Sequence, residues 1–558
     1  MRHTKSPVSR PRPAAPWPDW HGSVSVPAFG GGMIRSTILM LAAALPLAGT
    51  AGYAVAAPSA SEPAVGATDP AITPPMAPPT DTNPVASAVR TKLNGLPTDG
   101  SAQELKERAV LSDFYAARRD APMWLSEAGL TEKGAALGAE ILEADNWGLN
   151  AKDFDLPSIP PAAQLDSETI GKADVEISLA LLKYARYARG GRITEPSILL
   201  NSNLDRKPQL LDPELVIVGA ANAADPAAYV RGLHPQHPQF QKLRQALLGN
   251  KGKPLARKIL ANMEEWRWMA DLGEVHIMAN VPEFMVYLVK DGARIHTERI
   301  VVGETGKQTS IFTRNLKTIV FKPMWRVPDS IKAYELQPNL RRGGSMFREH
   351  DLDLETKDGK QLDYRSIDWN TANILDYEVV QHNGPKNVMG VVKFTFPSQH
   401  TIFMHDTIDK WMFAQGVRTL SHGCLRLRNP MKMAEVVLAE DKGWDAAKVQ
   451  TMMRQGGDNN EVVLEKKIPM HLVYFTAWVD DDGKLKTFND IYGHEKRIAL
   501  AIEGKWEQID IGRDHLAPVQ GGPGASEFSP GPQARQQRRQ KQPSTIVDMV
   551  GSALGGGF

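Results

Sequence analysis

The residue best suited to chemistry in this chain of 558 residues is its single cysteine, Cys424. A lone cysteine can form no intrachain disulfide and cannot supply the thiolate cluster of a structural zinc or iron–sulfur centre. It lies in the segment Ser421-His-Gly-Cys-Leu-Arg426, where Gly423 permits unusual dihedral angles and a close backbone approach beside the sulfur. This setting favours a nucleophilic thiol; a buried structural thiol and a fortuitous surface thiol are the alternatives.

A cysteine nucleophile needs a base, and four histidines lie near Cys424 in the sequence: His382, His400, His405 and His422. We predict that His405 is the base, because the alternating residues before it place it at the end of a strand, where catalytic groups are often mounted. The alternative for His405 is a histidine with a structural role at a strand end. We expect His382 and His400 to be surface residues.

The residues flanking the two predicted catalytic groups have supporting roles. Successive backbone N–H groups of His422, Gly423 and Cys424 can form an oxyanion hole, with Ser421 supporting the same loop. The imidazole of His422 is expected to be structural. Asp406 follows His405 directly, together with Thr407, and it is predicted to orient the ring or the loop, or to contact substrate.

A metal site is the competing interpretation of the same residues. Thiolate and imidazole are zinc ligands, so His405, His422 and Cys424 are conceivable as a partial ligand set. The spacing His-x-Cys is tight for two ligands, and the sequence offers no fourth partner. We therefore predict neither a metal nor a cofactor.

The N-terminal 57 residues have the layout of an extension followed by a secretory signal. Residues 33–57 combine Arg35, an apolar run over residues 38–47 and small residues ending in Ala54-Val-Ala56. We expect a cleaved signal peptide, with an uncleaved inner-membrane anchor as the alternative, so the folded part lies in the periplasm. The natural start is either Met1 or Met33.

The next segments divide into a linker and a helical domain. Residues 58–88 are rich in proline and alanine and are expected to form an extended linker. Residues 89–250 show helical periodicity, for example over residues 104–119, 133–145 and 174–189. No chemistry is visible there, so this region is predicted to be an α-helical scaffold domain.

A period of two replaces the helical period near residue 272. Successive strands, with a hairpin turn at Asp291-Gly292, indicate a mostly β domain over residues 255–514, and hence an α+β multidomain chain. The strand pattern is interrupted over residues 323–390, the natural position for a substrate-capping lid. Residues 515–558 are basic and rich in glycine and glutamine, and we expect a disordered tail.

The charge balance limits the partners of the chain. It has 65 basic and 64 acidic residues, so no overall field suggests binding to nucleic acid. The tryptophans Trp266, Trp268 and Trp325 are candidate carbohydrate platforms, although packing in the core or lid is the default for them.

Several of these segments together resemble a known enzyme family. Met404-His-Asp-Thr407, then Ser-His-Gly-Cys-Leu-Arg with eighteen residues between His405 and Cys424, is similar to the signature of YkuD-type L,D-transpeptidases. Residues 113–125, 147–150 and 188–193 resemble the helical scaffold of the large YcbB-type members. Residues 387–397 resemble the strand that precedes the catalytic histidine. The resemblance covers roughly residues 90–505.

The resemblance implies a specific reaction. Cys424 would attack the carbonyl between the L-centre of meso-diaminopimelate and D-alanine in a peptidoglycan tetrapeptide stem. His405 would take the thiol proton and later activate the amine of a second stem. D-alanine would leave through a cysteine acyl-enzyme, and a 3–3 cross-link would form. The family also implies acylation of Cys424 by the carbapenem class of β-lactams.

Further residues are carried over from the family by position. Arg426 stands where the family often has an arginine, which supports the loop or binds a substrate carboxylate. Trp325, Arg326 and Tyr334 belong to the expected lid and are candidates for substrate binding. Large members usually have a peptidoglycan-binding domain between scaffold and catalytic domain, for which residues 249–254 leave no room.

Three other functions stay open from the sequence. Water as acceptor would give an L,D-carboxypeptidase, and the amino group of an envelope protein would give an enzyme that anchors proteins to the wall. A wall-binding scaffold without catalysis is the alternative of another class. The intact pair of His405 and Cys424 argues against it.

Overall fold

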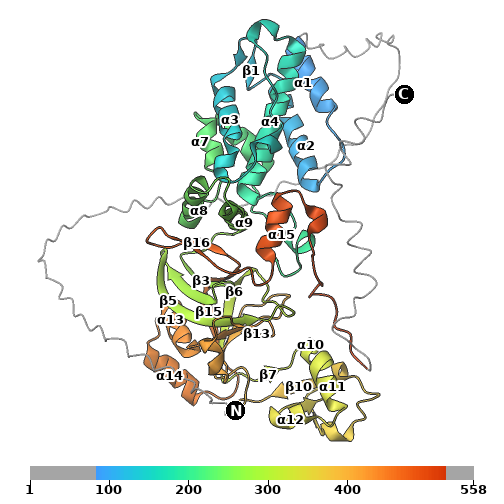
Figure 1. Cartoon of the computed structure of the whole chain (residues 1–558), viewed down its shortest axis with the longest axis vertical. Coiled ribbons are helices and arrows are strands. Elements are labelled where there is room, and N and C mark those ends of the chain that lie inside the picture. Colours follow the sequence, from blue (N-terminus) through green and yellow to red (C-terminus); the bar gives the residue numbers. More distant parts are fainter. Residues whose placement is uncertain (1–82, 523–558) are drawn as a thin grey trace, which may run out of the picture. The chain divides into compact units, whose positions relative to one another are not determined.

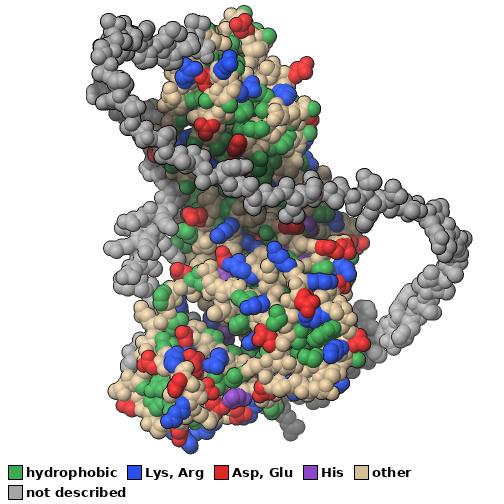
Figure 2. Space-filling view, turned by 180° about the vertical axis from the view of Figure 1, so that it is seen from behind, with side chains coloured by type: hydrophobic (Ala, Val, Ile, Leu, Met, Phe, Trp, Pro, Cys, Tyr) green, Lys and Arg blue, Asp and Glu red, His purple; other side chains and the backbone are tan. Residues whose placement is uncertain are grey.

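The computed structural model describes residues 83–522 (Figure 1). The predicted N-terminal extension, the signal peptide and most of the linker lie outside the described residues, as does the tail after residue 522. Within residues 83–522 no helix is both long and apolar enough to cross a membrane. On the face in Figure 2, acidic and basic side chains are interspersed, in keeping with the near balance of charges.

The first part of the described chain is a helical domain with an apolar core of its own. The long helix α4 contributes Val175, Leu181 and Leu182 to this core, where they meet residues of the neighbouring helices such as Leu111 and Leu137. The principal helices are α1 (Pro84–Asn94), α2 (Ala102–Ala117), α3 (Glu132–Leu142), α4 (Ser167–Gly190), α6 (Pro213–Asn222), α7 (Pro226–Arg231), α8 (Pro238–Leu248) and α9 (Pro254–Arg267).

The start of α1 corrects the expected linker boundary at residue 88. The helix begins at Pro84, and the side chain of Asn83 accepts hydrogen bonds from the backbone N–H groups of Val85 and Ala86. Asn-Pro is a helix-start signal, because asparagine caps the first turn and proline fits its first position. The proline-rich composition before it concealed this signal.

The second part of the chain is built on a nine-stranded sheet in the order β13-β5-β14-β12-β11-β6-β15-β3-β4. Strand β4 also pairs with β5, so the sheet closes on itself and protects strands that would otherwise form an edge. Its strands are β3 (Val275–Asn280), β4 (Met285–Lys290), β5 (Ala293–Gly303), β6 (Thr313–Phe321), β11 (Val392–Thr395), β12 (Met404–His405), β13 (Thr419–Ser421), β14 (Leu425–Leu427) and β15 (Asn460–Val473).

One face of this sheet is the main apolar core. Alternate strand residues such as Phe394, Met404 and Leu425 are fully buried there and pack in one cluster with Val437 and Leu438 of helix α13 (Pro430–Lys442). Because side chains alternate along a strand, the intervening residues lie on the other face. That other face carries both predicted catalytic side chains.

The expected lid is a small folded unit. Between β6 and β11 lies a four-stranded sheet in the order β7-β10-β8-β9, with an apolar cluster that includes Leu336, Phe347 and Trp369. The prediction that strands are interrupted over residues 323–390 was therefore wrong in part. Each of the strands found there has only two to four residues, too few for a period of two to appear in the sequence. They are β7 (Trp325–Arg326), β8 (Asp353–Glu355), β9 (Gln361–Leu362) and β10 (Glu378–Gln381).

The helical and β parts are joined through α9, whose sequence falls at the expected start of the β domain. Trp266 of α9 stacks on Phe475 with ring centroids 4.6 Å apart and lies in one cluster with Phe240 of α8. Residues 249–253 are all that separates α8 from α9, so no further domain lies between them. The helix therefore packs in an apolar cluster to which both the helical and the β parts contribute.

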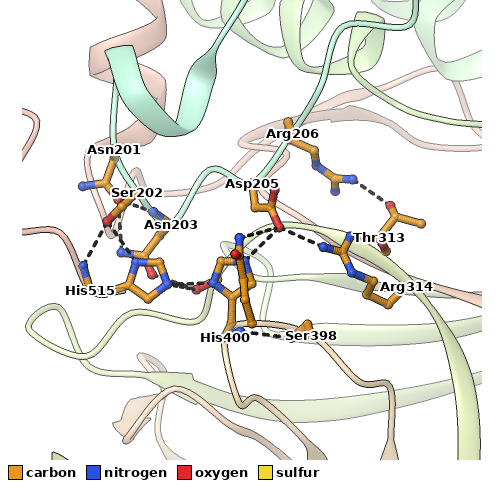
Figure 3. Close-up of polar contacts among 12 residues, drawn as sticks. Asn201, Ser202, Asn203, Asp205, Arg206, Thr313, Arg314, Ser398, His400 and His515 are labelled. Atoms are coloured by element: carbon orange, nitrogen blue, oxygen red, sulfur yellow. Dashed lines mark hydrogen bonds and ion pairs between the residues drawn. The ribbon is translucent and has the colours of Figure 1, made fainter. Parts of the chain in front are cut away.

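The segment after helix α15 (His494–Ile502) corrects two expectations (Figure 3). His515 was placed in a disordered tail and His400 on the surface, yet their rings stack with nitrogens 2.7 Å apart, and His400 is buried. His400 also bonds Asp205 at 3.0 Å, and His515 bonds Ser202 at 2.9 Å. This junction cluster ties the C-terminal segment to the helical and β parts.

Candidate active site

The two predicted catalytic residues lie on neighbouring strands. β12 and β14 pair in parallel, with His405 opposite Arg426. Two residues earlier on each chain segment, and therefore on the same face, Cys424 lies against Phe403, whose backbone nitrogen is 3.5 Å from Cys424 Sγ. Residues paired across two strands project from the same face. Strand pairing therefore brings His405 and Cys424 together on one face, although eighteen residues separate them in the sequence.

His405 is held as a neutral imidazole. Its Nδ1 is 2.5 Å from the backbone carbonyl oxygen of Asp406, which can only accept, so Nδ1 carries the proton and Nε2 keeps its lone pair. Burial, together with the nearby cations Arg426 and Lys393, lowers the pKa of His405 to about 3. The ring is therefore unprotonated at neutral pH.

Cys424 is half-buried, and burial raises the pKa of its thiol. The N–H of Phe403 and the cations Arg426 and Lys393 act in the opposite direction, but burial has the larger effect. The thiol is thus protonated at rest beside a neutral imidazole. A protonated thiol and a neutral imidazole are the protonation states that general-base activation of a nucleophile requires.

The loop that carries Cys424 is fixed by hydrogen bonds to its own backbone and to the end of β5. The hydroxyl of Ser421 donates to the carbonyl oxygen of Cys424 at 2.6 Å, and the hydroxyl of Thr309 donates to that of Gly423 at 2.7 Å. Gly423 has φ of +112°, and a Cβ atom on Gly303 would lie only 2.9 Å from its Cα. Both glycines are needed because the two backbones touch here.

The predicted oxyanion donors are not equivalent. The N–H of Gly423 donates to the Ser421 hydroxyl at 3.2 Å, so it is already used within the loop. For the N–H groups of His422 and Cys424, the described part of the chain supplies no acceptor. These two N–H groups are therefore the ones available to an oxyanion.

Asp406 is used entirely within the protein. One carboxylate oxygen accepts from the backbone of Thr407 at 2.7 Å and from Lys410, and the other accepts from the backbone of Val391 at 3.0 Å. The side chain is buried, and a Cβ atom on Gly390 would collide with it. Its carboxylate shapes the loop after His405, while its carbonyl oxygen orients the ring.

Arg426 is likewise engaged with protein groups. One guanidinium nitrogen lies 3.2 Å from a carboxylate oxygen of Asp409 and within bonding distance of Thr407 and Met412. These partners come from the connection between His405 and Cys424. Arg426 thereby stabilises this connection and places a positive charge near both His405 and Cys424.

The imidazole of His422 points to the lid unit. Its Nε2 lies 2.8 Å from a carboxylate oxygen of Glu335, which also binds Lys307 at 2.7 Å. Burial alone would raise the pKa of Glu335, but hydrogen bonds from His422 and Lys307 outweigh it and lower the pKa to about 2. A charged contact therefore joins the lid unit to the loop that carries Cys424.

The other lid candidates lie differently. Trp325 is in β7, opposite Gln381, and packs against the apolar cluster of the lid. Tyr334 lies one residue before Glu335, and the guanidinium of Arg513 is 5.8 Å from its ring centroid. The structure therefore brings Glu335 rather than Trp325 or Tyr334 into contact with the nucleophile loop.

Sequence reasoning missed Glu335, Lys307 and Thr309. Glu335 lies 87 residues from His422, Thr309 lies 114 residues from Gly423, and Lys307 lies 28 residues from Glu335. Nothing in their local sequence marks them, because their neighbours are set by the sheet order and by the position of the lid. Among the described residues, no group of three or more histidine, cysteine, aspartate or glutamate side chains is placed to hold a metal ion.

Comparison with known proteins gives the class of both domains. Residues 274–451 match the YkuD family, an L,D-transpeptidase catalytic domain, and residues 109–247 match a scaffold domain family. A protein of Haemophilus influenzae named "Putative L,D-transpeptidase" is 25% identical over 413 residues, which are 73% of this chain and 82% of that protein. A solved L,D-transpeptidase from Mycobacterium smegmatis is 12% identical, with a TM-score of 0.18, and covers 36% of this chain and 58% of its own.

The YkuD match contains both His405 and Cys424, and the scaffold match contains most of the helical domain. The fold is accordingly a helical scaffold region followed by a mostly β catalytic domain. The chain thus combines a region that matches a scaffold domain with one that matches an L,D-transpeptidase catalytic domain.

Proposed function

We propose that this protein forms 3–3 cross-links in peptidoglycan through an acyl-enzyme on Cys424. The observation that carries the proposal is the placement of His405 beside Cys424 on adjacent strands, with Nδ1 bound to a carbonyl oxygen and Nε2 left as a base. The match to an L,D-transpeptidase catalytic domain supports peptidoglycan peptide stems as the substrate class.

In the first half-reaction, the sulfur of Cys424 attacks the carbonyl carbon at the L-centre of meso-diaminopimelate, and His405 Nε2 takes the thiol proton. The negative oxygen of the tetrahedral intermediate accepts hydrogen bonds from the N–H groups of His422 and Cys424. The bond to nitrogen then breaks, and His405 returns the proton to the leaving amine. D-alanine departs, and a thioester remains on Cys424.

In the second half-reaction, the side-chain amine of meso-diaminopimelate in another stem attacks the thioester carbon. His405 takes a proton from this amine and returns it to the sulfur as the thioester breaks. The products are a 3–3 cross-linked dimer and free enzyme. No cofactor enters either step.

We further propose that the enzyme works in the periplasm, after export by the signal peptide predicted within residues 1–57. The lid unit would cover the donor stem during acylation. Trp325, Tyr334 and Glu335 are the lid residues proposed to contact the stem.

The test is incubation of the purified protein with a disaccharide tetrapeptide, followed by mass analysis. The proposal expects a cross-linked dimer together with free D-alanine, and neither product from Cys424→Ala. A tripeptide product without dimer would identify a carboxypeptidase, and a requirement for an added amino-terminal peptide would identify a protein-anchoring enzyme. Intact mass after carbapenem treatment is the control: one adduct is expected on the wild type and none on Cys424→Ala. A folded wild type that gives neither product nor adduct would leave only the wall-binding scaffold.

A further inference from the structure

Arg426 and Lys393 act on Cys424, and Lys307 lies near the same loop through Glu335, but these cations differ in what they bind. Arg426 is paired with Asp409 at 3.2 Å, and Lys307 is paired with Glu335 at 2.7 Å. For Lys393, by contrast, residues 83–522 show neither an ion pair nor a side-chain hydrogen bond, and the acidic groups acting on it, Glu461 and Cys424, act only through their charge. Its ammonium instead lies 5.1 Å from the ring centroid of Phe403.

Lys393 belongs to the catalytic face of the sheet. It lies opposite His405 in the pairing of β11 with β12, and His405 in turn lies opposite Arg426 in β14. Paired residues share a face, so Lys393, His405 and Cys424 project to the same side. The ammonium leans over Phe403, the residue whose backbone N–H contacts Cys424 Sγ.

A half-buried cation without a counterion is costly, because burial removes water without supplying an anion. Burial accordingly lowers the pKa of Lys393, with Glu461 and Cys424 acting in the opposite direction. A bound carboxylate would remove this cost. Lys393 is therefore the cation near the nucleophile that is best prepared to receive an anionic group of the substrate.

The order of groups across the strands matches the order of groups in the donor. In the proposed reaction, Cys424, which directly precedes β14, must contact the scissile carbonyl, and His405 on β12 must contact the leaving nitrogen. The next strand, β11, carries Lys393. In a tetrapeptide donor, the next charged group after the leaving nitrogen is the carboxylate of D-alanine, two bonds further, about 2.5 Å away.

We propose that Lys393 is a specificity-determining residue that binds the free carboxylate of the departing D-alanine. This inference rests on the proposed function and deepens it. It means that the enzyme selects donors in which the scissile bond is followed by a single residue with a free carboxyl group. A donor extended by one residue, or closed by an amide, would leave Lys393 without its anion.

The test compares two donors that differ only in charge: the tetrapeptide acid and the tetrapeptide with a C-terminal primary amide. The wild type is expected to favour the acid by about 10- to 100-fold in kcat/KM, measured as release of D-alanine or D-alaninamide. Lys393→Met is expected to reduce this preference to within about threefold, chiefly by losing activity on the acid. Lys393→Arg should keep part of the preference, since the charge remains.

Lys317→Met is the matched control, because Lys317 is exposed on the neighbouring strand β6 and its loss changes the net charge equally. It should keep the wild-type preference. The ratio of acid to amide is unaffected by any change in folding or in the thiol pKa, since both donors use the same Cys424.

The outcomes separate the two proposals. A wild type that releases no D-alanine from the acid refutes the proposed function, and the inference with it. A wild type that uses acid and amide equally overturns the role of Lys393 alone. So does a Lys393→Met variant that loses activity on both donors in equal measure, which would assign Lys393 to stabilising the thiolate.

Discussion

Two buried histidines only five residues apart, His400 and His405, occupy sites of opposite kinds. His405 uses Nδ1 on a backbone carbonyl oxygen, and no partner for Nε2 occurs in the described part of the chain. His400 uses both nitrogens, one on Asp205 at 3.0 Å and the other on His515 at 2.7 Å (Figure 3). A histidine with one nitrogen left over can move a proton, whereas one with both nitrogens bonded holds segments together.

The partners explain the difference. His405 is oriented by the residue that follows it, so its geometry is set locally at the end of β12. His400 is oriented by residues 195 and 115 positions away, from the helical part and from the C-terminal segment. The local contact of His405 fixes the orientation of one ring, whereas the distant contacts of His400 hold separate segments of the chain together.

The largest effect is expected from removing the free nitrogen. His405→Gln should lower the rate of D-alanine release by about 10²- to 10⁴-fold, the usual contribution of a general base. Its thermal unfolding should change little, since Nδ1 makes a single hydrogen bond. His400→Gln is the matched control and should keep activity within about threefold of wild type after correction for folded protein. Equal losses in both variants would contradict the distinction between the two sites.

A smaller effect, on stability, is expected at the junction cluster. His515→Ala leaves His400 and the hydroxyls of Ser202 and Ser310 short of a partner, so unfolding by urea should become easier by about 1–3 kcal/mol. Activity per folded molecule should remain near that of wild type. A loss of activity larger than the loss of folded protein would mean that the cluster also acts on the catalytic face.

The same variant should alter the dependence of stability on pH. Burial first, and then the neighbouring His400 and Arg513, lower the pKa of His515 to about 4, against the opposing influence of Asp514 and Asp205. Between pH 6.5 and 4 the unfolded chain binds a proton that the folded chain does not, so stability falls as pH falls. His515→Ala should therefore give a shallower loss of stability in this window, measured by urea unfolding at several pH values.

The smallest effect is expected where a contact lies partly in solvent. Glu335→Gln removes the charge that joins the lid to His422 and Lys307, and partly exposed ion pairs contribute about 0.2–1 kcal/mol. The KM for the tetrapeptide should change by less than about fivefold, with kcat nearly constant. Lys307→Met is the companion variant and should behave alike. A loss in kcat of tenfold or more would show that Glu335 contacts the reacting groups.

What the sequence predicted correctly was local. The motif around Cys424, the strand that ends at His405 and the change from a helical to a β period each depend on neighbouring residues. The confirmed parts are the family, the helical scaffold region and the mostly β catalytic domain. Assigning roles to Cys424 and His405 remains a prediction.

What the sequence could not predict depends on distant contacts. His400 appears polar and exposed in its own segment, and only Asp205 and His515 make it a buried residue. The contact of Glu335 with His422 depends on how the lid unit is placed against the sheet. The absence of a counterion for Lys393 within the described residues depends on which distant segments surround it. No local sequence motif can therefore predict it.

The parallel pairing of β12 with β14 has a consequence for how this enzyme can vary. Parallel neighbours need a long crossover, here residues 406–424, and its length does not determine the distance between the two strands. Insertions or exchanges in its exposed stretch, around Trp411 and Val417, would leave the catalytic pair in place while altering the surface beside it. The surface beside the pair can therefore vary independently of the chemistry proposed for Cys424.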